Sequence, residues 1–201
     1  MPLLLETIKI ENGIAYNIDY HQVRLAQTQK SLWGIQEPIL LKNILTDLPK
    51  EGLYRCRICY NTQFESIEYI PYKAKHIETL KMISSSIDYS HKYAKRETFN
   101  TLLEIHSDVN EILIEKEGYL TDTTIANIAF YDGKQWLTPS KPLLEGTMRA
   151  KLLDEGYIKP YAIKKSDLKN YTKVALMNAM IGFKILKKIS ISDTKGKIYD
   201  Y

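Results

Sequence analysis

The segment LTDTTIANIAF, residues 120–130, carries one carboxylate, Asp122, and one amide, Asn127, in an otherwise apolar and hydroxylic run. Burying an unpaired carboxylate costs free energy, so the side chain of Asp122 is expected to face either water or a fixed positive partner. A second possibility is that Asp122 caps a turn through Thr124. The partner of this carboxylate therefore decides whether the segment is a structural turn or part of a binding site.

Two further short segments carry basic side chains at helical spacing. Lys92 and Arg96 are four residues apart in YSHKYAKRETF, residues 89–99, just before a predicted helix. Arg24 follows His21 by three residues in YHQVRL. Taken alone, each segment is typical of a solvated basic surface, so neither assigns a chemistry by itself.

The sequence lacks the common motifs of hydrolases, nucleotide-binding proteins and zinc enzymes. G-x-S-x-G, G-x-x-x-x-G-K-[ST], G-x-G-x-x-G and H-E-x-x-H are all absent. The histidines at positions 21, 76, 91 and 106 do not have metal-ligand spacing, so no metal is expected. Cys56 and Cys59 lie an odd number of residues apart on a predicted strand, which favours two reduced thiols over a disulfide.

Length and composition are those of an ordinary soluble globular protein. The chain has 201 residues, of which 44% are hydrophobic and 26% charged, enough for one large domain or two small ones. The net charge of +4 comes from scattered lysines, which permits acidic ligands but does not single out nucleic acid. No apolar run approaches the roughly 20 residues of a membrane span. The start, MPLLLETIKIENG, lacks the basic region of a signal peptide, so we expect a cytoplasmic protein without nucleic-acid or membrane partners.

Residues 1–74 are predicted to form a small α+β domain. A hairpin over LLLETIKI, ENG and IAYNI opens it. A helix follows from its expected N-cap, Asp19, to Gly34, and a short helix covers PILLKNILTDL. A second hairpin, from GLYRCRICYN to FESIEYIPY, completes the domain.

Residues 75–201 are predicted to form a larger, strand-rich domain. IETLKMI begins it as a strand, and KRETFNTLLEIH is a helix. EILIEKEGYLTD and NIAFYDGKQWLTP form a meander with turns at the Glu-Gly and Asp-Gly pairs. TMRAKLLDEG is a helix, SDLKNYT is a helical turn, and KVALMNAM and GFKILKKI are strands. Helices and hairpins are mixed, which indicates an α+β fold and not a wound parallel sheet.

Taken together and in this order, the polar segments resemble the fold-type IV pyridoxal-phosphate enzymes, that is, the class-IV aminotransferase and aminodeoxychorismate lyase family. The resemblance runs from about residue 4 to residue 186, and its most specific block is residues 117–153. There the sequence reads EGYLTD, ANIAF, TP and LLEGTMR, as in the family pattern of an E-G-x-[ILV]-T-E start, an asparagine before a hydrophobic residue, a T-P turn and a glycine before a helix. The resemblance implies a two-domain, D-amino-acid aminotransferase-like fold and a homodimer.

The resemblance also implies roles for individual residues around pyridoxal 5'-phosphate. Lys92 would hold the cofactor as a Schiff base and shuttle protons. The phosphate would be bound by the residues Arg24, Thr147, Met148, Asn178 and Ala179. Asp122 replaces the family's glutamate beside the ring nitrogen, and Asn127 matches the asparagine that follows it. Because aspartate is one methylene shorter, the strength of the contact with the ring nitrogen is the point at which this sequence departs from the family.

The core motifs do not separate a lyase from a transaminase, because both reactions use the same cofactor geometry. The helix-start and C-terminal motifs are similar to those of the lyases, which favours a 4-amino-4-deoxychorismate lyase releasing pyruvate and 4-aminobenzoate, a folate precursor. Arg55 and Arg57 share one face of a predicted strand and would suit the two carboxylates of that substrate. The alternative is an aminotransferase acting on branched-chain or D-amino acids. A third interpretation, a cofactor-binding protein that has lost its activity, is opposed by the intact Lys92.

Overall fold

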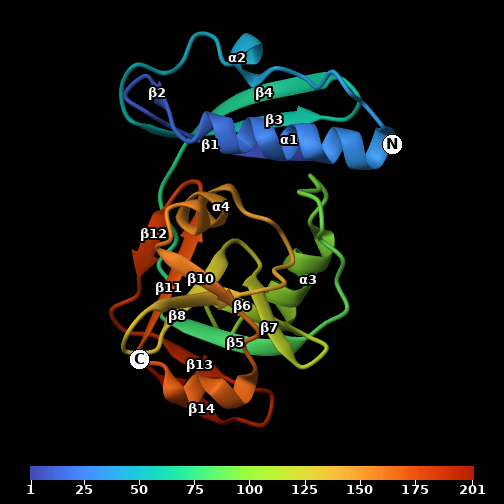
Figure 1. Cartoon of the computed structure of the whole chain (residues 1–201). Helices are drawn as coiled ribbons and strands as arrows, with labels where there is room; N and C mark the ends of the chain where they lie inside the picture. Colours follow the sequence, from blue (N-terminus) through green and yellow to red (C-terminus); the bar gives the residue numbers. More distant parts are fainter. The chain divides into compact units, whose positions relative to one another are not determined.

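The computed structural model describes all 201 residues and divides into two compact units, shown in Figure 1. Unit 1 contains Met1–Ala74 and His91–Lys95, and unit 2 contains Lys75–Ser90 and Arg96–Tyr201. Residues 91–95 were predicted to lie in the second domain. They belong to unit 1 because they pair with its first strand: the Leu5 N–H donates to the Lys92 carbonyl (2.8 Å), and the Ala94 N–H donates to the Leu3 carbonyl (2.9 Å).

Unit 1 is built on an antiparallel sheet of four strands in the order β2-β1-β3-β4. The strands are β1 (Leu4–Glu11), β2 (Ile14–Ala15), β3 (Leu53–Tyr60) and β4 (Phe64–Pro71). The predicted first hairpin is confirmed, and its two turn residues, Asn12 and Gly13, have φ values of 50° and 81°. Positive φ at both positions is the geometry that gives Asn-Gly its preference for tight hairpins.

Two helices complete unit 1. Helix α1 (Ile18–Trp33) ends at Gly34 as predicted, with a φ of 69° at that glycine. The predicted N-cap was wrong: the cap is Asn17, and Asp19 lies in the first helical turn. The second helix was predicted too long, because α2 (Leu41–Ile44) is a single turn that ends where Leu45 leaves the helical conformation. The core between sheet and helices contains Leu4, Ile8, Ile10, Leu25, Leu41, Cys56, Ile58 and Tyr60.

Unit 2 is built on a mixed sheet of ten strands, with β10-β9-β8-β7-β6-β5-β13-β14 along its main path and β11 pairing with β8 and β12. The strands are β5 (Thr79–Ser84), β6 (Glu111–Lys116), β7 (Tyr119–Thr123), β8 (Asn127–Tyr131), β9 (Trp136–Pro139), β10 (Ile158–Tyr161), β11 (Lys173–Asn178), β12 (Gly182–Ile185), β13 (Ser190–Ser192) and β14 (Ile198–Asp200). Parallel pairing is confined to β5 with β6, β5 with β13, and β9 with β10. The predicted α+β class is therefore confirmed, while β10, β13 and β14 were not anticipated.

Three helical segments accompany this sheet: α3 (Glu97–Ile105), α4 (Thr147–Asp154) and a 3-10 helix at Lys165–Asn170. In Figure 1, α4 lies beside β10 and β11, and α3 lies beside the strands of the green and yellow part of the unit. The buried core of the unit includes Leu80, Met82, Leu113, Ile128, Phe130, Val174, Leu176 and Ile191. This core holds β7 and β8, the two strands that carry the segment with Asp122 and Asn127.

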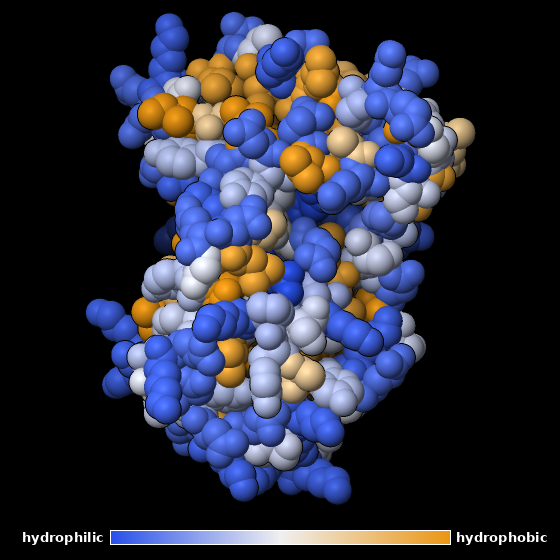
Figure 2. All heavy atoms as spheres, in the orientation of Figure 1, coloured by the Kyte–Doolittle hydropathy of each residue, from blue (hydrophilic) through white to orange (hydrophobic).

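The visible face of the molecule is mainly hydrophilic, with apolar residues concentrated on unit 1 (Figure 2). Among the exposed large apolar side chains of that unit are Ile14, Val23, Leu40 and Phe64. No helix in the structure is both long enough and apolar enough to span a membrane.

Candidate functional site

The residues predicted to form the site are distributed over both units. Unit 1 contains Lys92, in the segment beside β1, Arg24 on α1, and the pair Arg55 and Arg57 on β3. Unit 2 contains the other predicted residues: Asp122, Asn127, Thr147, Met148, Asn178 and Ala179.

Asp122 is a buried carboxylate whose hydrogen-bond donors are neutral. Its side chain lies on β7, and the residue is 4% exposed. The Asn127 side-chain amide donates to Oδ1 (2.8 Å), and the Leu144 backbone N–H donates to Oδ2 (3.0 Å). Burial raises the pKa of Asp122 from 3.8 to about 6, because these hydrogen bonds and the charge of Arg149 only partly offset the lost hydration.

Two expectations for Asp122, exposure to water and a cap on the turn through Thr124, are wrong, whereas a positive partner from outside the chain stays a prediction. The carboxylate faces neither water nor a cationic side chain in direct contact. It also does not cap the turn through Thr124, because the Thr124 hydroxyl donates to Glu111 (2.6 Å). The chain therefore surrounds Asp122 with neutral donors and leaves its negative charge without an ion-pair partner of its own.

Asn127 is held on one side by Asp122 and on the other by the loop before α4. Its Nδ2 donates also to the Leu144 carbonyl (2.9 Å). A Cβ placed on Gly146 would lie 2.0 Å from Asn127 Oδ1, so the loop approaches the amide too closely for any side chain at that position. This close approach explains why the residue before α4 is glycine, and it fixes Asn127 and hence Asp122.

Thr147 and Met148 form the first turn of α4, as predicted, and Thr147 is buried. Gly146 is the N-cap of this helix and has no side chain with which to cap it. Backbone N–H groups at a helix start bind anions well, because they point outward along the positive end of the helix dipole. The position is chemically suited to phosphate, and the roles of both residues stay predictions.

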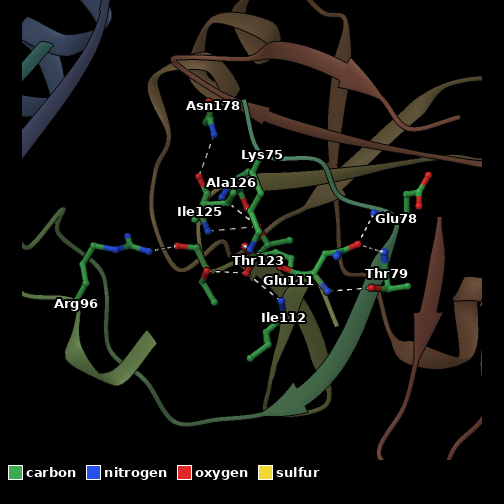
Figure 3. A network of polar contacts seen from close by, with 12 residues as sticks. Lys75, Glu78, Thr79, Arg96, Glu111, Ile112, Thr123, Ile125, Ala126 and Asn178 are labelled. Atoms are coloured by element: carbon green, nitrogen blue, oxygen red, sulfur yellow. Dashed lines mark hydrogen bonds and ion pairs between the residues drawn. The ribbon is translucent and has the colours of Figure 1, made fainter. Parts of the chain in front are cut away.

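Asn178, at the end of β11, is part of a network that holds the turn between β7 and β8 (Figure 3). Its amide donates to the Ile125 carbonyl (3.1 Å), and its oxygen accepts from the backbone N–H groups of Met180 (2.9 Å) and Ile181 (3.0 Å). The side chain of Asn178 thus shapes the backbone around it. A role for Asn178 and Ala179 in binding phosphate stays a prediction.

Arg96 takes part in the same network, which sequence reasoning did not find. Its Nη2 donates to the Thr124 carbonyl (2.6 Å), and its guanidinium lies over the ring of Phe99, 4.9 Å from the centroid. The four-residue spacing from Lys92 singled out Arg96, but it did not indicate which group Arg96 would bind. A carbonyl 28 residues away in sequence leaves no local signal.

Unit 1 contains a second buried carboxylate, Glu6, which has two basic partners. Glu6 and His21 are both fully buried, and His21 Nδ1 donates to Glu6 Oε2 (2.6 Å). Arg24 contacts both carboxylate oxygens, through Nε to Oε1 (2.9 Å) and Nη2 to Oε2 (2.5 Å). Burial would raise the pKa of Glu6, but Arg24 and His21 outweigh it and lower the pKa to about 2.

The cluster of Glu6, His21 and Arg24 changes the interpretation of two residues. Two of the three guanidinium nitrogens of Arg24 are committed to Glu6, so the arginine is fixed in orientation. Burial lowers the pKa of His21, and the nearby charge of Lys92 contributes in the same direction. Lys92 therefore lies within electrostatic reach of this cluster, which sequence reasoning missed.

Arg55 and Arg57 alternate on β3 with the buried residues Cys56 and Ile58, so they share the face away from the core, as predicted. Arg57 is paired with Glu68 on β4 at 3.4 Å. Arg55 Nε is buried without a hydrogen-bond partner. Their proposed role in binding a substrate stays a prediction. The thiols of Cys56 and Cys59 are free, as expected from their spacing.

Unit 2 also contains a cavity of about 400 Å³. Its walls include Tyr119, Leu120, Leu143, Tyr161 and Ile163. None of the predicted site residues lines it, so the cavity is separate from the roles assigned above. No group of three or more His, Cys, Asp or Glu side chains is placed to hold a metal ion.

Comparison with known proteins connects these features to a family. The model of the family described as amino-transferase class IV matches residues 3–189. An uncharacterized protein of Haemophilus influenzae strain Rd is 40% identical over 185 residues, which cover 89% of this chain and 98% of that protein.

Solved structures share the fold. A crystal structure from Haemophilus somnus 129pt, of a protein provisionally named 4-amino-4-deoxychorismate lyase, has a TM-score of 0.83 and 39% identity, covering 90% of this chain and 98% of the other. The pyridoxal-phosphate-bound form of a hypothetical aminotransferase from Mycobacterium tuberculosis has a TM-score of 0.73 at 16% identity, covering 92% of this chain and 80% of the other. The predicted fold type is confirmed. Because the family model and a relative of 40% identity both extend over most of its length, the chain belongs to the class IV aminotransferase family.

Proposed function

We propose that this chain is a pyridoxal-phosphate-dependent lyase that converts 4-amino-4-deoxychorismate into 4-aminobenzoate and pyruvate. The observation that carries the cofactor assignment is the environment of Asp122, a buried carboxylate with neutral donors and a pKa raised to about 6. A protonated ring nitrogen is a cation that would satisfy this carboxylate and lower its pKa again. The residues present therefore fit the chemistry of the cofactor at its ring.

Other residues of the chain offer groups suited to the phosphate and to the covalent attachment of the cofactor. Arg24, held by Glu6, offers a guanidinium in fixed orientation, and the start of α4 offers backbone N–H groups, both suited to a phosphate dianion. Lys92 offers a primary amine for covalent attachment, with its backbone fixed by Leu5 and by Tyr93 pairing with Leu4. When bound, pyridoxal phosphate supplies an electron sink for a carbon that loses a proton.

The chain's own residues would then transfer the proton and stabilise the charge. The Lys92 Nζ takes the proton from the amine-bearing ring carbon of the substrate. The bond between the ring and the enolpyruvyl oxygen breaks, the ring becomes aromatic, and the enolpyruvate gains a proton to become pyruvate. Asp122 would stabilise the protonated ring nitrogen of the bound cofactor, and no second substrate is required.

The choice of a lyase over a transaminase is supported by a similar protein whose structure is matched over most of both chains. The Haemophilus somnus protein with the provisional lyase name is 39% identical and is covered over 98% of its length. Arg55 and Arg57 remain the residues proposed to meet the substrate's carboxylates. A homodimer is expected from the family resemblance.

The test is to incubate purified protein and pyridoxal phosphate with 4-amino-4-deoxychorismate and to follow pyruvate and 4-aminobenzoate together. Equal release of both products is expected. Lys92→Ala should abolish it, while Lys95→Ala, a lysine of the same segment without an assigned role, serves as the matched control and should retain it. Activity that survives in Lys92→Ala would refute the assignment of this lysine.

A negative result has a defined meaning. Protein that binds the cofactor, seen by its visible absorbance, but releases neither product would exclude the lyase. Pairs of amino acids and keto acids, branched-chain and D-amino acids first, would then test the aminotransferase alternative. Protein that binds the cofactor and transforms no amine would be a binding protein without activity.

A further inference from the structure

The turn Thr123–Ala126 joins the two strands that carry Asp122 and Asn127, and it is held from several directions. Within the turn, the Thr123 N–H donates to the Ala126 carbonyl (2.9 Å), and the Ala126 N–H donates to the Thr123 hydroxyl (3.1 Å). From outside, Arg96 binds the Thr124 carbonyl and Asn178 binds the Ile125 carbonyl. Figure 3 shows the turn between Arg96 on the left and Glu111 on the right, with Asn178 above.

Glu111 is the least expected member of this network. It is the first residue of β6 and is fully buried. Its Oε1 accepts from the Thr124 hydroxyl (2.6 Å) and from the Ile112 N–H (2.9 Å), whereas its Oε2 has no hydrogen-bond partner. Lys75 forms an ion pair with this oxygen, with its Nζ 3.6 Å from Oε2.

Burial of a carboxylate in this position costs free energy of folding. Carboxylates lose much hydration on burial, and an apolar residue at the start of a strand would avoid that loss. The Thr124 hydroxyl is the donor of this bond and Glu111 Oε1 is its acceptor. The result is a short, directional bond from β6 to the turn, two residues from Asp122 along the chain.

We propose that Glu111 is a positioning residue that acts through the Thr124 hydroxyl to fix the turn Thr123–Ala126, and with it the place of the Asp122 carboxylate. Arg96 and Asn178 hold the backbone carbonyls of the turn, and Glu111 holds its side chain. Release of the side chain lets the turn loosen, so water reaches Asp122 and the carboxylate no longer faces the cofactor ring in a fixed position. The effect on the cofactor rests on the proposed function, but the effect on Asp122 does not.

The first measurement uses the protein without cofactor. The pKa of the Asp122 carboxyl is followed by carbon-13 NMR with labelled aspartate, and its signal is assigned by its absence in Asp122→Asn. Thr124→Val, which removes the donor, and Glu111→Leu, which removes the acceptor, should each lower this pKa by at least one pH unit as the site becomes hydrated. Glu111→Gln and Thr124→Ser keep the bond and should titrate as the wild type does.

Thr138→Val is the matched control. Thr138 is also fully buried, and its hydroxyl donates to the Ile128 carbonyl (2.8 Å), but it does not touch the turn. Its loss should leave the pKa of Asp122 unchanged. An unchanged pKa in both Thr124→Val and Glu111→Leu, or an equal shift in Thr138→Val, would overturn the proposal. If Thr124→Val does not fold, Thr124→Ala removes the same hydroxyl without adding a methyl group.

The second measurement adds the cofactor. The dissociation constant of pyridoxal phosphate should rise about tenfold in Thr124→Val and stay within twofold of the wild type in Glu111→Gln. Wild-type protein that binds no pyridoxal phosphate, yet shows the expected NMR pattern, would refute the proposed cofactor and support the positioning role. Variants that show the NMR shift but bind the cofactor as tightly as the wild type would refute the link between the turn and the cofactor.

Discussion

Glu6 in unit 1 and Asp122 in unit 2 are both buried carboxylates, but their environments differ in one respect. Glu6 has two basic partners, Arg24 and His21, and a pKa of about 2. Asp122 has neutral donors and a pKa of about 6. Because burial is nearly the same for both, the partner alone decides the direction of the shift.

The difference separates a carboxylate held in a structural ion pair from one that contacts no cationic side chain. The charge of Glu6 is satisfied by the chain itself, and its main effect is to stabilise unit 1 and orient Arg24. The charge of Asp122 has only neutral hydrogen-bond donors, so its burial costs free energy in the chain by itself. A perturbed carboxylate of this second kind is what a binding site for a cationic ring requires, and it is a better indication of function than burial alone.

Among the variants that test this comparison, removal of the Glu6 carboxylate is expected to have the largest effect on stability. Glu6→Leu removes the carboxylate that accepts from both the fully buried imidazole of His21 and the guanidinium of Arg24, which is 12% exposed, and should lower the free energy of unfolding by about 3–5 kcal/mol. Urea denaturation measures the change. The control is Glu68→Leu, on β4 of the same sheet, because Glu68 is 55% exposed and pairs with Arg57 at 3.4 Å. That exposed pair should contribute less than about 1 kcal/mol. Equal losses of unfolding free energy in the two variants would show that the buried contacts of Glu6 contribute no more to stability than the exposed pair of Glu68.

The second test uses pH, because the two carboxylates contribute with opposite sign. The pKa of Asp122 is higher in the folded protein than in the unfolded chain, so the folded state binds the proton more tightly and loses stability as pH rises from about 4 to about 6. A shift of about two pH units corresponds to about 3 kcal/mol. The stability of wild type minus that of Asp122→Asn should therefore fall across this window in cofactor-free protein, and other groups cancel in the difference.

Glu6 is expected to behave in the opposite way. Its folded pKa lies below the unfolded value, so its contribution is fully present above about 4.5 and is lost as pH falls towards about 2. Thermal unfolding of wild type, Asp122→Asn and Glu6→Leu across this pH range measures both contributions. Parallel stability profiles for wild type and Asp122→Asn between pH 4 and 6 would contradict the raised pKa of Asp122.

The sequence predicted the hairpins, the main helices and the α+β class, because those features depend on local turn chemistry and periodicity. Glu6 was also accessible to such reasoning: it alternates with Leu4, Ile8 and Ile10, so β1 must bury a carboxylate beside apolar residues. That alternation went unused, although His21 and Arg24 had been identified as a pair. The helices and strands that carry most of the predicted site residues were predicted from the same local patterns.

Other features could not be predicted from local patterns. The second donor to Asp122 is the backbone of Leu144, 22 residues away, and a backbone N–H leaves no residue-type signal. The acceptor for Thr124 is Glu111, 13 residues earlier and on another strand. Strands β13 and β14 have three residues each, too few for a periodic pattern. In each case the contact is set by tertiary packing and not by nearby sequence.

A smaller effect is expected from crowding the amide that supports Asp122. Gly146→Ala places a methyl group 2.0 Å from Asn127 Oδ1, so Asn127 must move and its bond to Asp122 must lengthen. The backbone itself is not strained, because Gly146 has a φ of −70°. Overpacking of this kind should cost about 1–3 kcal/mol of stability and weaken cofactor binding together. Denaturant unfolding and a cofactor titration measure the two effects, and a variant with unchanged binding would show that Asn127 does not position Asp122.

The smallest effect on turnover is expected from Asp122→Glu, which restores the residue type of the family pattern. Asp122→Asn should weaken turnover at least about tenfold without unfolding the chain, because an amide cannot stabilise a protonated ring nitrogen through charge. Asp122→Glu keeps that charge and lengthens the side chain by one methylene, so turnover should be retained or raised. Steady-state kinetics on the amine substrate, with the fold checked by circular dichroism, separates the two outcomes. A folded Asp122→Glu protein without activity would mean that the donors Asn127 and Leu144 define a pocket fitted to the shorter acid, and that the aspartate is an adaptation of this chain.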